Sequence, residues 1–184
     1  MLWPLFLRLQ HRRVLLVGGG AVAEQKARAL ALAGAEVVVV APEIRHSLRH
    51  FEHHLRPVQQ DDLTSIWLVV SAAPADVNRQ VAQWAEPLQR FVLAVDDPLA
   101  GTAFGAAVLE RGGVTVALSS SGHAPGLIAL LRAAIEALLP DDLEAWVALA
   151  QSVRQAHKAA RIPLGERVPL LLKELNRLYA ERAT

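Results

Sequence analysis

A glycine-rich turn between a buried strand and a helix restricts the fold of this chain more than any other feature. The apolar run 14–17 leads directly into the pattern Gly18-x-Gly20-x-x-Ala23, and residues 21–33 have the spacing of a helix. Such a tight turn needs glycine, and it lets the backbone at a helix N-terminus approach a pyrophosphate closely. The pattern predicts the first βα unit of a dinucleotide-binding fold, although a merely structural glycine turn is the alternative.

Strands and helices alternate through the first two thirds of the chain. After the first strand, we expect strands at 37–40, 55–59, 66–70 and 91–95 and a helix at 76–88. Short strands that alternate with helices of this length are typical of right-handed βαβ crossovers and a parallel sheet. The sequence therefore predicts an α/β fold of the Rossmann type.

The pattern changes after Arg111. One more strand is expected at 114–118, and helices follow from Pro125 to about 139, after Asp141, and from about 166 to 182. We therefore predict three parts. These are a Rossmann-like domain at 1–112, a short α/β segment at 113–140 and a C-terminal helical domain at 141–184.

Composition excludes several classes of function. With 19 Lys and Arg against 18 Asp and Glu, the net charge of +1 favours neither nucleic acid nor a membrane surface as partner. The absence of cysteine excludes disulfides, thiolate metal sites and a cysteine nucleophile. The longest charge-free run, 112–131, holds glycines and Pro125, so it is not a spanning helix, and the start of the chain lacks the features of a signal peptide. We expect a soluble cytoplasmic protein.

The end of the second strand bears on the choice of cofactor. Glu43 lies twenty residues after Ala23, where a carboxylate can bond the adenine ribose of a dinucleotide. The ribose could instead rely on backbone groups near Pro42. No arginine occupies the strand end itself, although Arg45 is close, so NAD is favoured over NADP.

Two further segments carry groups that could do chemistry. Asp96 and Asp97 follow the strand at 91–95, at the edge of the sheet where α/β proteins bind ligands, and could accept a proton or hold a substrate N–H. A simple turn is the alternative. The loop from Ser119 to Pro125 offers N–H and O–H donors to an anion, or it caps a helix, and His123 could add a cation.

A cluster of histidines raises the question of a metal-binding site. His46, His50, His53 and His54 have spacings that would bind a transition metal on a helix. Arginines in the same stretch would repel a cation, so we favour a solvated face and predict no metal site.

Two classes of dehydrogenase are excluded. The short-chain class needs a Tyr-x-x-x-Lys pair, and the only tyrosine, Tyr179, has no such lysine. A zinc alcohol dehydrogenase in its usual forms needs cysteine ligands, which this chain lacks. The chain is also short for separate cofactor and substrate domains, which favours a substrate pocket completed by a second subunit.

Taken together, these motifs resemble the precorrin-2 dehydrogenase/sirohydrochlorin ferrochelatase family, which includes the N-terminal module of bacterial sirohaem synthases. The resemblance follows the order and spacing of that family over nearly the whole chain, at 4–7, 14–27, 39–43, 95–98 and 119–125, and faintly at 165–167.

The resemblance implies NAD-dependent oxidation of precorrin-2 to sirohydrochlorin, in some members followed by insertion of ferrous iron. It implies that Asp96 is the catalytic carboxylate and general base, that Ser120 and His123 lie near the tetrapyrrole substrate, and that the protein is a homodimer. The residues expected to contact the cofactor are Gly18, Gly20, Ala21, Val22, Pro42 and Glu43.

Departures from the family pattern keep an alternative open. Leu93 stands where the family often has Asn, and residues 72–74 replace a Thr-Asp-Asp stretch. These changes motivate a catalytically inactive module that binds or senses NAD or a tetrapyrrole. Because precorrin-2 carries many carboxylates, basic side chains should line its site. The candidates are Arg12, Arg13, Arg111, Arg132 and His123, although for each one taken singly a solvated surface charge is the favoured interpretation.

Overall fold

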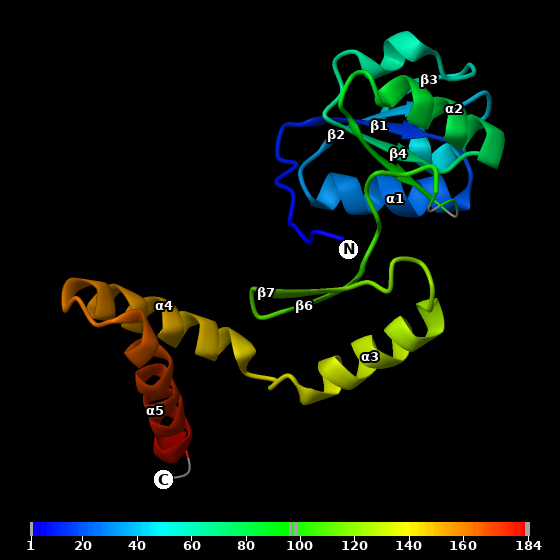
Figure 1. The fold of residues 1–184 in the computed structure, drawn as a ribbon. Coiled ribbons are helices and arrows are strands. Elements are labelled where there is room, and N and C mark those ends of the chain that lie inside the picture. Colours follow the sequence, from blue (N-terminus) through cyan, green and yellow to red (C-terminus); the bar gives the residue numbers. More distant parts are fainter. Residues whose placement is uncertain (1, 96, 98, 183–184) are drawn as a thin grey trace. The chain divides into compact units, whose positions relative to one another are not determined.

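The computed structural model describes residues 2–95, 97 and 99–182 (Figure 1). The chain divides into two compact units. The first comprises Met1–Gly105 with Ser121–His123, and the second comprises Ala106–Ser120 with Ala124–Thr184. The three-part division expected at 1–112, 113–140 and 141–184 stays a prediction.

A five-stranded parallel sheet forms the centre of the first unit, with the strand order β3-β2-β1-β4-β5. The strands are β1 (Arg13–Val17), β2 (Glu36–Val40), β3 (Glu52–His54), β4 (Leu68–Ser71) and β5 (Phe91–Ala94). The chain builds outward from β1 on one side through β2 and β3, and then returns to β1 to build β4 and β5 on the other. The order therefore reverses between β1 and β4, and ligands bind at such a switch point.

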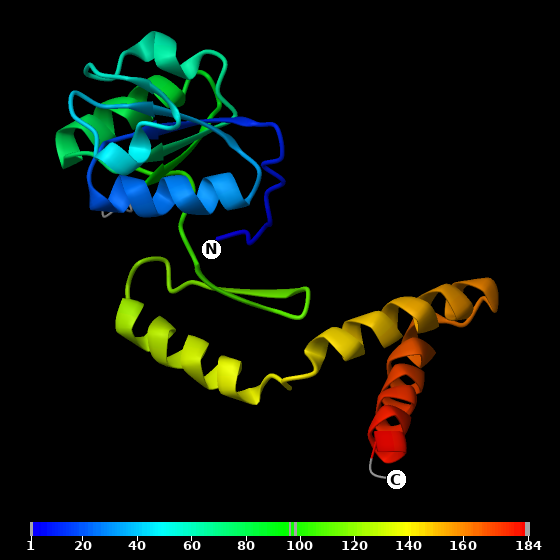
Figure 2. The same ribbon diagram turned by 180° about the vertical axis from the view of Figure 1, so that it is seen from behind.

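Helices cover both faces of this sheet (Figures 1 and 2). On one face, α1 (Ala21–Leu32) packs Ala23 and Ala27 against the cluster that contains Val14 and Leu16. On the other, α2 (Ala75–Ala85) lies with the short helix η2 (Gln60–Leu63) over the cluster that contains Leu15 and Val17. Neighbouring side chains of β1 thus belong to opposite layers, as the pleat of a strand requires. The α/β, Rossmann-like prediction is confirmed.

The third strand lies elsewhere than the sequence predicted. It was expected at 55–59, but β3 occupies Glu52–His54 and pairs with the second half of β2. Pro57 lacks an N–H to donate to a ladder. The Arg56 guanidinium binds both carboxylate oxygens of Asp62 in η2, at 2.7 and 2.8 Å, and turns the chain away from the sheet. The same guanidinium holds the pKa of Asp62 below its usual value.

The second unit begins with an antiparallel hairpin of β6 (Ala107–Arg111) and β7 (Val114–Leu118). The turn is Gly112–Gly113, and both glycines have positive φ, at 54° and 79°. The sequence analysis predicted β7 but missed β6, because β6 ends in charged residues and buries only Leu109. The glycine pair between two strands is itself a hairpin signal.

Three helices complete the second unit: α3 (Pro125–Leu138), α4 (Leu143–Ala159) and α5 (Leu164–Arg182). A short hydrogen-bonded chain ties α4 to α5. Trp146 Nε1 donates to the Tyr179 hydroxyl at 2.7 Å, and that hydroxyl donates to Asp142 at 3.0 Å. Within the described residues, none of the helices combines the length and the apolar character needed to cross a bilayer.

Candidate dinucleotide site and switch-point cavity

The first two glycines of the turn after β1 are required by the packing of the fold. Gly18 has a φ of +121°, and a Cβ there would collide with the carbonyl oxygen of Ala72 at the end of β4. A Cβ on Gly19 would collide with the carbonyl oxygen of Glu43 in the loop after β2. The turn is therefore pressed between the carboxyl ends of two neighbouring strands, and a side chain at either position would force them apart.

Gly20 differs from its two neighbours. It has an extended conformation, and a Cβ there would meet no described atom within 4 Å. Gly20 is the N-cap of α1, and its carbonyl accepts the N–H of Glu24 at 3.0 Å. The N–H groups of Ala21 and Val22 have no acceptor inside the helix, as at any helix start, and they suit an anion.

The loop after β2 lies against the same turn. Pro42 and Glu43 are exposed, and Arg45 N–H donates to the carbonyl oxygen of Gly19 at 3.0 Å. The structure therefore gathers the six predicted cofactor residues, from Gly18 to Glu43, at one edge of the sheet. Gly19 was not among the predicted residues, because its need for glycine comes from a contact with a residue far along the chain.

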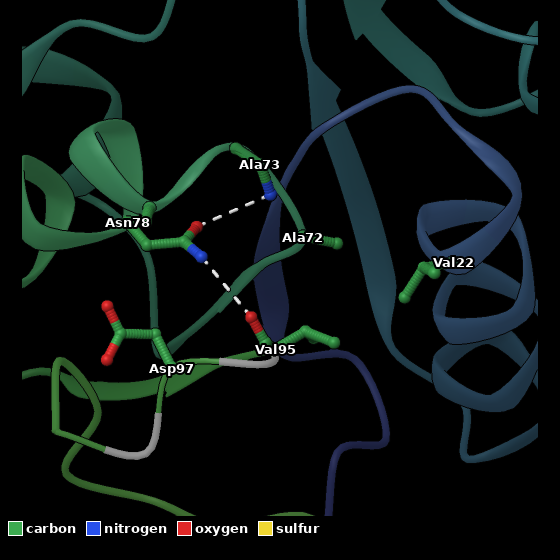
Figure 3. A pocket seen from close by; sticks show the side chains of 7 residues that line it. Val22, Ala72, Ala73, Asn78, Val95 and Asp97 are labelled. Carbon is green, nitrogen blue, oxygen red and sulfur yellow. Dashed lines mark hydrogen bonds between the residues drawn. The ribbon is translucent and has the colours of Figure 1, made fainter.

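A cavity of about 140 Å³ opens at the switch point and is called the switch-point cavity below. Figure 3 shows Val22 of α1 on one side of it and Asn78 and Asp97 on the other. Its lining residues come from the ends of β4 and β5 and from the starts of α1 and α2: Val22, Ala72, Ala73, Ala75, Asn78, Val95 and Asp97.

Asn78 joins the ends of β4 and β5 beside this cavity (Figure 3). Its Oδ1 accepts the Ser71 hydroxyl at 2.6 Å and the Ala73 N–H at 3.3 Å, and its Nδ2 donates to the carbonyl oxygen of Val95 at 3.3 Å. Both Ser71 and Asn78 are buried. This link was not predicted, although a polar residue at helical spacing from Val81 on an otherwise apolar face is a signal for it.

The carboxylates expected after β5 are only partly within the described structure. Asp96, the predicted catalytic residue, lies outside the described residues. Asp97 borders the switch-point cavity, and its Oδ2 lies 3.8 Å from Nε of Arg79 in α2. A carboxyl group beyond β5 thus lies at the same cavity as the open N-terminus of α1.

The loop from Ser119 to Pro125 contains a hydrogen bond between two residues of the second unit. The Ser120 hydroxyl oxygen accepts the Ala124 N–H at 2.9 Å, just before α3, which is the helix-capping arrangement. His123 is exposed. The hydroxyl proton of Ser120 is not used in that bond, so the group can still donate to a ligand.

The histidine-rich stretch does not form a helix. His46 begins a single 3₁₀ turn, while His53 and His54 lie in β3, so the spacing that would bind a metal on a helix is lost. His53 Nδ1 lies 2.9 Å from the carbonyl oxygen of Phe51. Across the part of the chain that the structure describes, no three His, Asp or Glu side chains group as metal ligands would.

The arginines considered for substrate binding have partners within the protein. Arg13 pairs with Glu52 at 2.9 Å, and Arg12 lies over the ring of Trp67. In the second unit, Arg111 donates to the carbonyl oxygen of Leu139 at 2.9 Å, and Arg132 to that of Val108 at 3.1 Å. These contacts favour structural roles for the four side chains.

Comparison with known proteins shows the family to which the first unit belongs. Residues 5–106 match a family described as "Putative NAD(P)-binding". Siroheme synthase 3 of Aeromonas hydrophila subsp. hydrophila is 43% identical over 171 residues, and siroheme synthase 1 of Aeromonas salmonicida is 40% identical over 171 residues. Each alignment covers 89% of this chain but 36% of the relative, so the chain spans little more than a third of their length.

A solved structure titled "SirC, precorrin-2 dehydrogenase" has the same fold. It superposes with a TM-score of 0.72 at 20% sequence identity, over 94% of this chain and 88% of the other.

Replacing Asn78 tests the link between the strand ends. We expect Asn78→Ala to lower the free energy of unfolding by about 1–3 kcal/mol, because it leaves the Ser71 hydroxyl and the Val95 carbonyl without their partner. Denaturant titration measures this loss. The exposed Gln83 on the same helix is the matched control, and Gln83→Ala should change stability by less than about 0.5 kcal/mol. Equal effects of the two substitutions would contradict the role given to Asn78.

The glycines provide a second test. Gly19→Ala should destabilise the protein by about 1–3 kcal/mol, because its Cβ meets backbone. Gly20→Ala should change stability by less than about 0.5 kcal/mol, since the space is open, yet weaken NADH binding about tenfold or more if a pyrophosphate fills that space. Thermal unfolding and NADH fluorescence titration separate the two effects. Wild-type NADH affinity in Gly20→Ala would place the pyrophosphate elsewhere.

Proposed function

Because the chain belongs to the NAD(P)-binding family whose model matches residues 5–106, we propose that it is an NAD-dependent dehydrogenase that oxidises precorrin-2 to sirohydrochlorin. The observation that carries this proposal is the switch-point cavity, which is lined by Val22 near the open N-terminus of α1 and by Asp97 after β5. The similarity to siroheme synthases over 89% of the chain supports the substrate. Iron insertion stays a prediction of the sequence resemblance.

The described residues fit a bound dinucleotide. Gly20, Ala21 and Val22 offer open space and helix N–H groups to the pyrophosphate, and Pro42 and Glu43 lie where the adenine ribose would be held. Gly18 contributes by closing the turn against β4. When bound, NAD supplies an acceptor for a hydride from the substrate.

Asp96, which follows β5, is proposed to act as the base of the reaction. Dehydrogenation removes a hydride and a proton from precorrin-2, and Asp96 is the base proposed to take the proton. Asn78 holds the carbonyl of the preceding residue, Val95, and Asp97 borders the cavity on the same side. Val22 and Ala72 give the other side of the cavity an apolar lining.

Substrate contacts from the serine loop are part of the proposal. The Ser120 hydroxyl and the exposed His123 could donate hydrogen bonds to the carboxylates of a tetrapyrrole. A cytoplasmic location fits a chain without cysteine, which needs no oxidising compartment.

A homodimer is proposed from the surface of α3. No residue of this helix is buried, and its leucines are unusually exposed: Leu127 at 54%, Leu130 at 72%, Leu131 at 43% and Leu138 at 81%. Apolar side chains gathered in this way mark an interaction surface. A second copy of the chain is the proposed partner, because the family resemblance implies a homodimer.

Turnover of precorrin-2 tests the proposed reaction. Under anaerobic conditions, precorrin-2 and NAD should yield NADH, measured at its near-ultraviolet absorbance. Asp96→Asn should lower kcat by about a hundredfold or more with little change in NAD affinity, because it removes the proton acceptor. Asp97→Asn is the matched control and should stay within about tenfold of the wild type.

Two results would contradict parts of this proposal. A wild-type rate in Asp96→Asn would remove Asp96 from the mechanism. If the wild-type protein binds NAD but forms no NADH, the inactive binding module becomes the better interpretation.

The proposed dimer is tested by size-exclusion chromatography with light scattering, which gives the molar mass of the eluting protein. Leu130→Glu should raise the dissociation constant of the dimer about tenfold or more, because it places a charge in an apolar interface. Leu32 is 91% exposed on α1, so Leu32→Glu is the matched control and should leave the mass unchanged. A monomeric wild-type protein at micromolar concentration would contradict the proposal.

A further inference from the structure

Three side chains converge on one carboxylate next to the glycine turn. The Glu24 carboxylate accepts Arg28 Nη2 at 2.6 Å on one oxygen and Arg45 Nη1 at 2.9 Å on the other. The Ser47 hydroxyl is a third donor to the same group. These four residues are called the Glu24 cluster below. The Glu24 side chain is only 15% exposed because the donors surround it.

The cluster lies where a Rossmann fold holds the adenosine ribose. Glu24 is in the first turn of α1, with its N–H on the Gly20 carbonyl at 3.0 Å. Arg45 and Ser47 come from the segment after β2, and the Arg45 N–H donates to the Gly19 carbonyl at 3.0 Å. In this fold the ribose 2′ position lies by the end of the second strand, and an arginine nearby accommodates the 2′-phosphate of NADP.

The donors of this cluster suit a phosphate. A guanidinium and a hydroxyl that point at one centre are common ligands of phosphate oxygens. Here an internal carboxylate satisfies them. The hydrogen bonds from Ser47 and Arg45 hold the pKa of Glu24 below its usual value, so the carboxylate stays charged at neutral pH. A 2′-phosphate carries a charge of about −1.5 to −2 and would be repelled by that carboxylate.

We propose that Glu24 selects NAD over NADP by occupying the place of the 2′-phosphate and binding the two side chains, Arg45 and Ser47, that would otherwise hold it. The inference rests on the NAD preference in the proposed function but not on the reaction with precorrin-2. It makes Glu24, which contacts no reacting atom, the residue that determines cofactor specificity.

Direct cofactor binding tests this inference without any substrate. Fluorescence titrations with NADH and with NADPH are made on the wild-type protein and on Glu24→Ala, which removes the charge and opens the space. The wild type should bind NADH about tenfold or more tightly than NADPH. Glu24→Ala should bind NADPH about tenfold more tightly than the wild type does, with NADH affinity within about threefold.

Three further variants show which group causes a gain in NADPH affinity. Glu24→Ala/Arg45→Met should lose the gain in NADPH affinity, because the freed guanidinium is gone. Glu24→Gln, which keeps the shape and removes only the charge, should gain less than Glu24→Ala. Glu52→Ala is the matched control, because Glu52 forms an ion pair of the same length with Arg13 at the opposite, amino edge of the sheet, and its loss should change neither affinity.

Several outcomes would overturn the inference. These are equal binding of NADH and NADPH by the wild type, unchanged NADPH affinity in both Glu24→Ala and Glu24→Gln, and a gain that persists without Arg45 or appears in Glu52→Ala. Circular dichroism checks that each variant is folded. If Glu24→Ala does not fold, Glu24→Gln still tests the inference. If the cofactor shifts occur as expected but precorrin-2 is not oxidised, the proposed reaction fails and the inference stands.

Discussion

The close contact of the glycine turn with two strand ends is the constraint on which the rest of this site depends. Gly18 lies against the Ala72 carbonyl after β4, and Gly19 lies against the Glu43 carbonyl after β2. Because no side chain separates them, the start of α1 is held at the point where the strand order reverses. Its free N–H groups, the segment after β2 and the switch-point cavity then share one edge of the sheet.

A fully buried polar group and a partly buried one play different parts around that edge. Asn78 lies inside the fold, where its amide satisfies Ser71 and the Val95 carbonyl and keeps the ends of β4 and β5 at a fixed separation. Glu24 lies near the surface and gathers donors that would otherwise be free to bind an anion. The first arrangement shapes the switch-point cavity, and the second is the one proposed to influence which cofactor binds beside it.

Much of the architecture could be predicted because its signals are local. The apolar run of β1, the glycines after it and the helical spacing of α1 are adjacent in the chain, and each is confirmed within a residue or two. The strand expected at 55–59 was wrong because Pro57 and the Arg56–Asp62 pair divert the chain there. A pairing between side chains of different elements outweighed the apolar pattern of a short segment.

By itself the sequence determined the fold class, the position of the glycine turn and the edge of the sheet at which a dinucleotide is proposed to bind, because hydrophobic period and turn chemistry act between near neighbours. Only the tertiary structure decided which glycine faces open space, that Asn78 joins two strands, and that Arg45 reaches Glu24 from 21 positions along the chain. Those contacts join segments that become neighbours only when the parallel sheet forms. No periodicity within one segment can therefore encode them.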